Sequence, residues 1–339
     1  MGTIDTLLNW IDINSVTGAE ADYGNALIGH LESLGFGAER QELSPGRFNV
    51  LARAKEPLVV MCTHLDTVPP FFGPTREGKL IRGRGSCDAK GPALAMIEAA
   101  QRVLKTGEQR IGFLFTVGEE TDGAGAQHAN KLIAAPWAPR YTIVGEPTDN
   151  RFIKGGKGVY QCKLHGKGVA GHSSQPLGPS AIHELVGAIQ RMLADEWGNS
   201  EVFGQGSINF GIIEGGLAGN VVAPEATATV LIRAVEDPAA ITERLRLHLG
   251  ENVELEIKKH YGPVEFALPE GEDGPVVAFG TDAPFLKKWG QPLLYGPGSI
   301  RDAHTAHEKL ELDSFEQAIA DYERVILELL ARVDAESKA

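Results

Sequence analysis

Short apolar segments alternate with helix-like segments through the first half of this chain, and this order constrains its fold more than any other feature. Three segments are apolar almost without interruption, as in strands that are buried on both faces of a sheet: residues 58–62 (LVVMC), 111–117 (IGFLFTV) and 141–145 (YTIVG). Helix-like patterns lie at 20–35, 92–105 and near 124–134. Strands and helices in this order predict an α/β layer with a mostly parallel sheet flanked by helices.

The pattern changes near residue 157. Residues 158–165, 207–213 and 226–233 alternate polar and apolar side chains, as half-exposed strands do, and a further strand is expected near 253–259. Helices are expected at 180–194 and 238–249. The resulting order, β-α-β-β-α-β, is that of a split βαβ unit.

After Gly262 the first pattern returns, with a helix expected at 279–289, a strand at 293–295 and a long helix at 312–335. The simplest interpretation is a discontinuous first domain, residues 1–157 and 263–339. A smaller four-stranded domain, residues 158–262, is inserted into it.

Composition excludes several classes of protein. The 339 residues suit two domains of ordinary size, and the formal net charge of −13 argues against nucleic-acid binding through a basic face. No apolar run approaches the ~20 residues that span a bilayer, and the first 15 residues lack the pattern of a signal peptide. Three cysteines, an odd and sparse set, suggest free thiols and a cytoplasmic protein.

Acidic and histidine residues stand at or just after the ends of the expected strands, the edge at which open α/β sheets bind ligands. Each has a structural alternative: a satisfied core histidine, a turn aspartate, or glutamates in a solvated loop. The candidates are His64, Asp88, Glu119, Glu120, Glu146 and His304.

Glu119 and Glu120 are adjacent carboxylates after an apolar strand, where they repel one another unless a cation or a proton is shared. One can bind a metal while its neighbour acts as general base. Taken together, the histidines and carboxylates suit a pair of zinc-like ions roughly 3.5–4 Å apart, which share a hydroxide.

Seven segments, in order over nearly the whole chain, resemble the co-catalytic zinc aminoacylase/carboxypeptidase family. This family includes acetylornithine deacetylase, succinyl-diaminopimelate desuccinylase and carboxypeptidase G. The segments are THLDTVPP, GRGSCDAKG, GEE at 118–120, VGEPT, GHSS, GGLAGNVVAPEATATVLIR and GPGSIRDAHTAHE. The resemblance implies a zinc-hydrolase catalytic domain and an inserted ferredoxin-like lid domain that also dimerises.

The resemblance also implies roles for individual residues. One zinc ion would be held by His64, Asp88 and Glu146, and the other by Asp88 as a bridge, Glu120 and His304; cobalt or manganese could replace zinc. Asp66 would orient His64, and Glu119 would be the general base. In the lid, His172 would reach the partner subunit's active site, and Asn220 and Arg233 would hold the substrate's carboxylate.

One departure from the family pattern concerns His307, which stands where many relatives have an acid or an amide. We keep His304 as the ligand, with His307 as the residue that could alter the second metal site. The chain is also short for the family, so trimming of the lid or of loops is expected.

The implied reaction is hydrolysis of the amide bond of an N-acyl amino acid, first of all N-acetylornithine in arginine biosynthesis, by a cytoplasmic homodimer. Alternative substrates are N-acetylcitrulline, N-acetyllysine, N-succinyl-diaminopimelate and dipeptides or carboxypeptidase substrates. An aminopeptidase with a similar two-metal site and a metal-free binding or scaffold protein also stay open. No nucleic-acid or membrane partner is expected.

Overall fold

The computed structural model of the chain describes residues 2–338, and these residues form two compact units. Unit 1 contains the chain up to Lys154, Phe266–Pro275 and the residues from Thr281 onward. Unit 2 contains Gly155–Glu265 and Val276–Gly280. The chain therefore enters unit 2 twice, and a single insertion at 158–262 does not include the second crossing.

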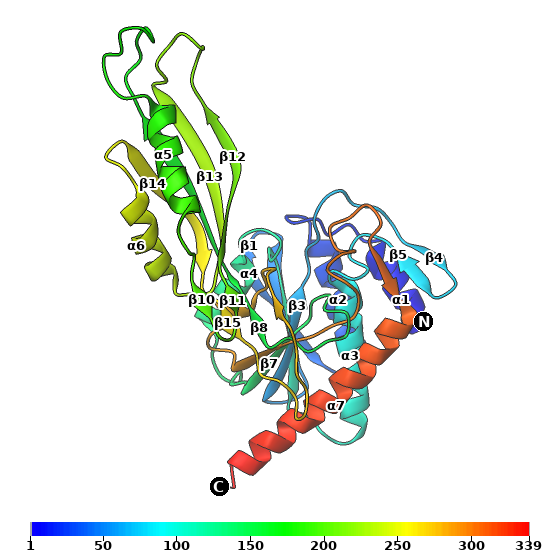
Figure 1. Cartoon of the computed structure of the whole chain (residues 1–339). Helices are drawn as coiled ribbons and strands as arrows, with labels where there is room; N and C mark the ends of the chain where they lie inside the picture. The colour runs from blue at the N-terminus through cyan, green and yellow to red at the C-terminus, as the bar shows by residue number, and fades with distance from the viewer. Residues whose placement is uncertain (1, 339) are drawn as a thin grey trace. The chain divides into compact units, whose positions relative to one another are not determined.

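Unit 1 is built on a six-stranded sheet whose strand order is β1-β2-β6-β3-β7-β17 (Figure 1). The neighbours β6, β3, β7 and β17 run parallel, as the sequence predicts, and they supply the sheet edge at which ligands bind. An antiparallel hairpin, β1 and β2, extends one side of the sheet and was not anticipated. The bounds are β1 Gly37–Ser44, β2 Arg47–Arg53, β3 Val59–His64, β6 Ile111–Thr116, β7 Tyr141–Val144 and β17 Gln291–Leu294.

Helices cover both faces of this sheet because its strands are apolar on both sides. Phe113 and Phe115 of β6 join a core with helices α1, α2, α3 and α7, whereas Leu114 between them joins a second core on the other face with α4. That alternation is the two-residue period of a strand. The bounds are α1 Thr3–Ile11, α2 Ala21–Ser33, α3 Lys90–Lys105, α4 Ala124–Leu132 and α7 Leu312–Glu336.

A small antiparallel sheet in unit 1, of order β18-β5-β4, joins two distant parts of the sequence. Strand β18 (Lys309–Glu311) pairs with β5 (Leu80–Arg82), which pairs with β4 (Thr75–Glu77). The segment that follows His304 is thereby fixed beside the segment that precedes Asp88.

The helix predicted at 279–289 is wrong. The structure has only a short 3₁₀ helix there, η1 Ala283–Phe285. Pro284 supplies no N–H to an α-helical ladder, and Gly290, at φ +84°, turns the chain into β17. The apolar spacing reflects packing instead, because Leu286 and Trp289 are buried in the second core.

Unit 2 has the ferredoxin-like order expected from the sequence. Its four antiparallel strands lie in the order β12-β13-β9-β14, and α5 and α6 contribute to the core against the sheet. Strand β13 alternates buried and partly exposed residues along its length, as a sheet covered on one face does. The bounds are β9 Gly158–Lys167, α5 Ala181–Leu193, β12 Ser207–Gly215, β13 Glu225–Ala234, α6 Pro238–His248 and β14 Val253–Tyr261.

Unit 2 also carries two small sheets. Strands β10 (Asn199–Ser200) and β11 (Gly204–Gln205) form a hairpin, and β15 (Val264–Glu265), β8 (Gly155–Gly156) and β16 (Val276–Val277) form a three-stranded sheet. All three cysteines of the chain, Cys62, Cys87 and Cys162, are free and buried, which confirms the thiol prediction. Among the described residues, no helix combines the length and the apolar character needed to cross a bilayer.

Candidate metal centre

His64 is the last residue of β3, and the turn after it fixes the orientation of its ring. Its Nδ1 lies 2.8 Å from the main-chain oxygen of Asp66, an atom that can only accept, so Nδ1 is the donor. Nε2 is thereby directed to the carboxylates of Asp88, at 2.9 Å, and Glu146, at 3.9 Å. The neutral ring would present its Nε2 lone pair at this point, as a metal-ligating histidine does.

Asp88 lies between two histidines. One carboxylate oxygen is 2.9 Å from His64 Nε2, and the other is 3.3 Å from His304 Nε2. His304 Nε2 is also 2.9 Å from a carboxylate oxygen of Glu120. All five predicted ligands are therefore connected through Asp88, the residue predicted to bridge the two ions.

The candidate ligands are carried by two kinds of element: the ends of parallel strands, and loops outside the six-stranded sheet. His64 ends β3, and Glu120 and Glu146 follow the parallel strands β6 and β7, as predicted. Asp88, however, precedes α3, and His304 lies in a turn between β17 and β18, with the unusual φ of +62°. The prediction that all six candidates stand at strand ends is wrong for these two, because the chain turns back to the sheet edge from elsewhere.

Burial and crowding alter the proton affinity of the acids. Burial raises the pKa of Glu119 and of Glu146 well above the ordinary value, with neighbouring carboxylates adding to the effect and His64 opposing it. The pKa of Glu120 is also raised, chiefly by burial. Three acids in one buried place favour a shared proton or a cation.

The histidines show the complementary effect. Hydrogen bonds to Asp88 and Glu120 raise the pKa of His304 to about 10. Burial lowers the pKa of His64, but Asp88 and Glu146 outweigh it, so the net shift is strongly upward. For Asp88, burial raises the pKa, but the hydrogen bonds to His304 and His64 outweigh burial, so the net shift of the pKa is downward.

These side chains stabilise positive charge at the place where their nitrogen and oxygen atoms converge. Single ligand atoms of His64, Asp88 and Glu120 all lie within 4.8 Å of one another. A mixed set of imidazoles and carboxylates is one that divalent zinc, cobalt or manganese accepts. The donor set therefore fits a metal centre.

Asp66 has a role that the sequence did not reveal. Its carboxylate is 3.8 Å from His64 Nδ1, whereas it accepts hydrogen bonds from the main-chain N–H groups of Glu119, at 3.1 Å, and Glu120, at 3.3 Å. Thr17 donates its hydroxyl hydrogen to the same carboxylate at 2.7 Å. Asp66 orients His64 through its main-chain oxygen and the 119–120 loop through its side chain.

In unit 2 the structure brings His172 and Asn220 together. They lie in the two loops at one end of the sheet, where His172 forms a bridge with Val221 and Ser173 N donates to the main-chain oxygen of Asn220. Nδ1 of His172 accepts the main-chain N–H of Ser174 at 3.2 Å. The neutral ring then carries its proton on Nε2.

Arg233 lies at the opposite end of the same sheet. It faces Val159 of β9, whereas Glu225, eight residues earlier on β13, faces the other end of β9. At ~3.3 Å per residue, Arg233 is roughly 26 Å from the loops that carry His172 and Asn220. Asn220 and Arg233 of one chain therefore cannot hold the same carboxylate.

Comparison with known proteins identifies the family. The sequence model of peptidase family M20/M25/M40 matches residues 60–328. The chain belongs to this family.

Curated relatives and solved structures agree with this assignment. A peptidase M20 domain-containing protein of Schizosaccharomyces pombe is 35% identical over 331 residues, which cover 94% of this chain and 82% of that protein. A probable carboxypeptidase of Talaromyces marneffei is also 35% identical and covers 93% and 83%. This M20 chain is therefore a hydrolase of a metallopeptidase family.

Two solved structures share the fold. The aminopeptidase PepT of Bacillus cereus gives a TM-score of 0.80 at 18% identity, with 97% of this chain and 98% of that chain covered. The YXEP protein of Bacillus subtilis, described as a dinuclear metal binding peptidase from the M20 family, gives 0.72 at 14% identity and 97% coverage of both chains.

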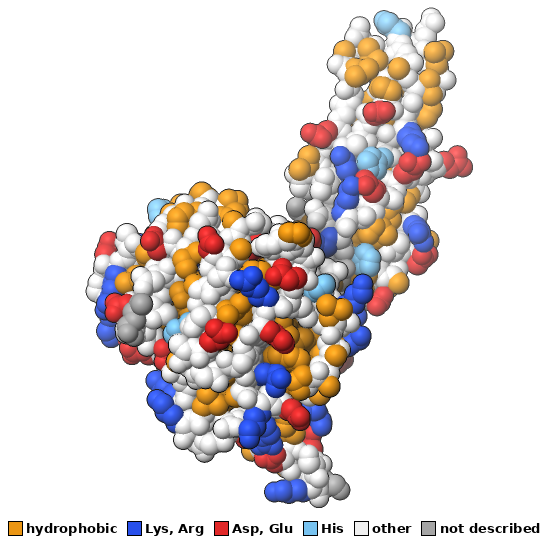
Figure 2. Space-filling view, turned by 180° about the vertical axis from the view of Figure 1, so that it is seen from behind, with side chains coloured by type: hydrophobic (Ala, Val, Ile, Leu, Met, Phe, Trp, Pro, Cys, Tyr) orange, Lys and Arg blue, Asp and Glu red, His pale blue; other side chains and the backbone are white. Residues whose placement is uncertain are grey.

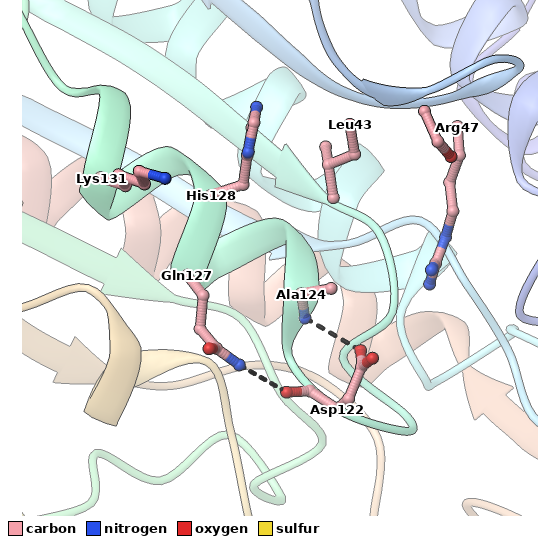
Figure 3. Close-up of a pocket in the computed structure, with 8 residues that line it drawn as sticks. Leu43, Arg47, Asp122, Ala124, Gln127, His128 and Lys131 are labelled. Carbon is pink, nitrogen blue, oxygen red and sulfur yellow. Dashed lines mark hydrogen bonds between the residues drawn. The ribbon is translucent and has the colours of Figure 1, made fainter.

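A separate hollow of about 570 Å³ is lined by residues from the end of β1, the start of β2 and the first two turns of α4 (Figure 3). Arg47, His128 and Lys131 line it with Asp122, whose carboxylate accepts the Ala124 N–H at the start of α4. Arg47 is paired with buried Glu20 at 3.4 Å. The fixed charges balance, and no predicted site residue lines this hollow.

Gly118, in the GEE segment, lies against Arg47 and Asp122, two residues that line this hollow. It has φ +76°, and a Cβ atom there would lie 2.4 Å from the guanidinium of Arg47. Any side chain at this position would displace the loop that holds Glu119 and Glu120, because both the backbone conformation and the space are reserved for glycine.

Proposed function

We propose that this chain hydrolyses the amide bond of a small substrate with a free carboxylate next to the scissile nitrogen, an N-acyl amino acid or a short peptide. The observation that carries the proposal is the convergence of His64, Asp88, Glu120, Glu146 and His304 around Asp88. We assign one cation to His64, Asp88 and Glu146, and a second to Asp88, Glu120 and His304. Zinc is the first choice, with cobalt and manganese as alternatives.

When bound, two such cations supply Lewis-acid polarisation of the carbonyl and make water acidic enough to attack near neutral pH. The residue that moves the proton is Glu119. Burial raises the pKa of its carboxyl, with His64 opposing the shift and Asp282 and Glu120 adding to it, and no ligand role is assigned to Glu119. The carboxylate of Glu119 takes a proton from the attacking water and returns it to the departing amine nitrogen.

Residues of unit 2 complete the proposal. His172 carries its proton on Nε2 and can donate to the oxyanion as the carbonyl becomes tetrahedral. Arg233 offers a forked guanidinium to the substrate's carboxylate. Because Arg233 lies roughly 26 Å from His172 and Asn220 in one chain, we assign His172 and Asn220 to the partner subunit and Arg233 to the chain that supplies the metal ligands.

A homodimer formed through unit 2 would make this possible. Strand β12 is an edge strand with exposed Ile212 and Ile213, and α5 exposes Ile182 and Val186 one helical turn apart. Hydrophobic side chains gather on the surface of unit 2 (Figure 2). Sedimentation equilibrium of the wild type and of Ile212→Lys/Ile213→Glu tests this: a dimer that becomes a monomer supports it, and a monomeric wild type contradicts it.

Among substrates, N-acetylornithine is the specific choice from the sequence resemblance, and it places the reaction in arginine biosynthesis in the cytoplasm. A second candidate is a carboxypeptidase or dipeptidase, which is supported by the name of the Talaromyces marneffei relative. Both substrates place a free carboxylate beside the scissile amide, so the same residues serve either reaction.

The decisive experiment measures amine release from a substrate panel with zinc or cobalt supplied. The panel contains N-acetylornithine, N-acetylcitrulline, N-acetyllysine, N-succinyl-diaminopimelate, simple dipeptides, and a dipeptide amidated at its carboxyl end. Preference for N-acetylornithine supports the deacetylase, and preference for dipeptides supports the peptidase. Efficient cleavage of the amidated dipeptide, or no turnover of any compound by the metal-loaded protein, contradicts the proposed substrate class.

A further inference from the structure

Glu308 is a fully buried carboxylate that faces the loop in front of α3. One of its oxygens accepts main-chain N–H groups from Gly85 at 2.9 Å, Cys87 at 3.2 Å and Asp88 at 3.2 Å. The other accepts a hydrogen bond from Arg84 Nη1 at 2.7 Å. A single side chain therefore holds the whole turn that ends in Asp88.

The fold delivers Glu308 to this position through strand pairing. Lys309, the first residue of β18, is paired with Arg82, the last residue of β5. The main-chain oxygen of Glu308 then accepts the N–H of Gly83 at 3.2 Å. The main chain of Glu308 is therefore held in place by the pairing of β18 with β5 and by its own hydrogen bond to Gly83.

The contacts of Glu308 occupy both of its oxygens. One accepts three main-chain N–H groups and the Cys87 thiol at 3.7 Å, and the other accepts Arg84, so we assign Glu308 no ligand role. His304, four residues earlier, is directed instead at Asp88 and Glu120. The same short segment supplies a ligand and, separately, an anchor for another ligand.

Arg84 extends this anchor to a third segment. Its guanidinium is buried, stands over the ring of Phe72 at 5.0 Å and donates through Nε to the main-chain oxygen of Pro70 at 3.3 Å. Pro70 and Phe72 follow the turn that carries His64 and Asp66. Arg84 and Glu308 therefore link the three segments that contribute His64, Asp88 and His304.

We propose that Glu308, held by Arg84, is the positioning residue that keeps Asp88 between His64 and His304 and so sets the metal affinity of the site. This inference rests on the proposed function only in treating Asp88 as a metal ligand. Loss of the Glu308 carboxylate would leave three buried N–H groups without their acceptor, and the turn would relax away from that geometry. Groups that orient metal ligands in this way typically change affinity 10–100-fold when removed.

The test compares two double variants, because removing Glu308 alone would leave the cation of Arg84 buried and unpaired. Arg84→Met/Glu308→Ala removes the charge pair and the acceptor, whereas Arg84→Met/Glu308→Gln removes the charges and keeps an oxygen for the N–H groups. Leu329→Ala, in the buried core of α7, is the control for lost stability without contact with the loop. Thermal melting of each variant establishes that it is folded.

Two quantities are measured: hydrogen exchange of the Gly85, Cys87 and Asp88 amides in chelated protein, and zinc affinity by competition with a chromophoric chelator. We expect at least 10-fold faster exchange and 10–100-fold weaker zinc binding in the alanine double variant, with most of both losses restored by glutamine. Zinc affinity equal to that of Leu329→Ala would overturn the inference.

The exchange measurement needs neither metal nor substrate, so it separates two failures. If the wild type binds no zinc, the proposed function fails. The anchoring of the Asp88 turn by Glu308 is then supported by faster exchange of those three amides in the alanine double variant, or overturned by unchanged exchange.

Discussion

His64 in unit 1 and His172 in unit 2 are both assigned to the reaction, yet the fold prepares them in opposite ways. His64 is buried, its Nδ1 donates to a main-chain oxygen, and its Nε2 is surrounded by carboxylates. His172 is exposed, its Nδ1 accepts a main-chain N–H, and its Nε2 keeps a hydrogen. One backbone contact thus decides whether a histidine offers a lone pair to a cation or a proton to an oxyanion.

The same contrast extends to the surroundings of the two histidines. In unit 1, His64, the four other candidate ligands and the anchors Asp66 and Glu308 restrain one another. Around His172, the contacts come from its own turn and from the neighbouring loop of Asn220. We infer that unit 1 holds a preorganised centre, whereas unit 2 supplies groups that are exposed for a partner molecule.

The largest expected effect comes from the proton carrier in unit 1. Glu119→Gln should lower kcat ~10²–10⁴-fold, because the amide cannot accept the proton of water. Zinc content, measured by elemental analysis, should remain that of the wild type, since Glu119 is not assigned as a ligand. Turnover close to that of the wild type would remove Glu119 from the mechanism.

In unit 2, His172→Ala should lower kcat by about 10²–10³-fold, as the loss of one oxyanion donor does, with zinc affinity unchanged. Mixing this variant with Glu119→Gln under subunit exchange tests whether His172 acts in the partner's site. About one quarter of wild-type activity should return, because one of two sites in each mixed dimer has both groups intact. No recovery in a mixture shown to contain mixed dimers would place His172 in its own chain's site.

A smaller effect is expected on stability from metal removal. Zinc at about 100 times its dissociation constant should stabilise unit 1 by ~2.7 kcal/mol for each ion bound, relative to chelated protein. Hydrogen exchange should show the gain in β3 and β6, whereas the core amides of β9 and β13 in unit 2 should change little. Equal protection of both units would mean that they unfold as one, and the contrast between them would fail.

The smallest effect is expected from a residue that has no assigned role in either candidate site. The side chain of Asp237 caps α6 by accepting the N–H of Ala239 at 2.8 Å. Asp237→Ala should destabilise unit 2 by about 1 kcal/mol, as the loss of a helix cap does, without a change in kcat or zinc affinity. A fall in zinc affinity, measured by chelator competition, would show that the stability of unit 2 influences the metal centre.

Much of the candidate site could be predicted because the carboxyl ends of parallel strands lie at the same edge of a sheet. His64, Glu120 and Glu146 each follow an uninterrupted apolar run, so periodicity alone placed them together. Asp88 and His304 were grouped with them as residues at strand ends, which is wrong, and the family resemblance gave the same grouping. Their approach depends on the pairing of β18 with β5, two strands of three residues each.

The main-chain contacts of Asp66 and Glu308 could not be predicted from the sequence, although Asp66 was expected to orient His64. Asp66 and Glu308 accept main-chain N–H groups, which every residue except proline offers, so their partners leave no compositional signal. The prediction of a helix at 279–289 is wrong because apolar spacing does not show whether a helix or a turn buries the side chains. Leu286 and Trp289 are spaced as on a helix but are buried by the packing of a turn.

The insertion of unit 2 into unit 1 has a consequence for how the chain is made. Strand β17, the His304 turn and α7 follow unit 2 in the sequence, yet they complete the sheet, the metal centre and the main core of unit 1. During synthesis, the four-stranded sheet of unit 2 can fold as soon as β14 has left the ribosome, while unit 1 waits with its apolar strands incompletely covered. The candidate metal centre can therefore form only after unit 2 has been synthesised, although four of its five proposed ligands precede unit 2 in the sequence.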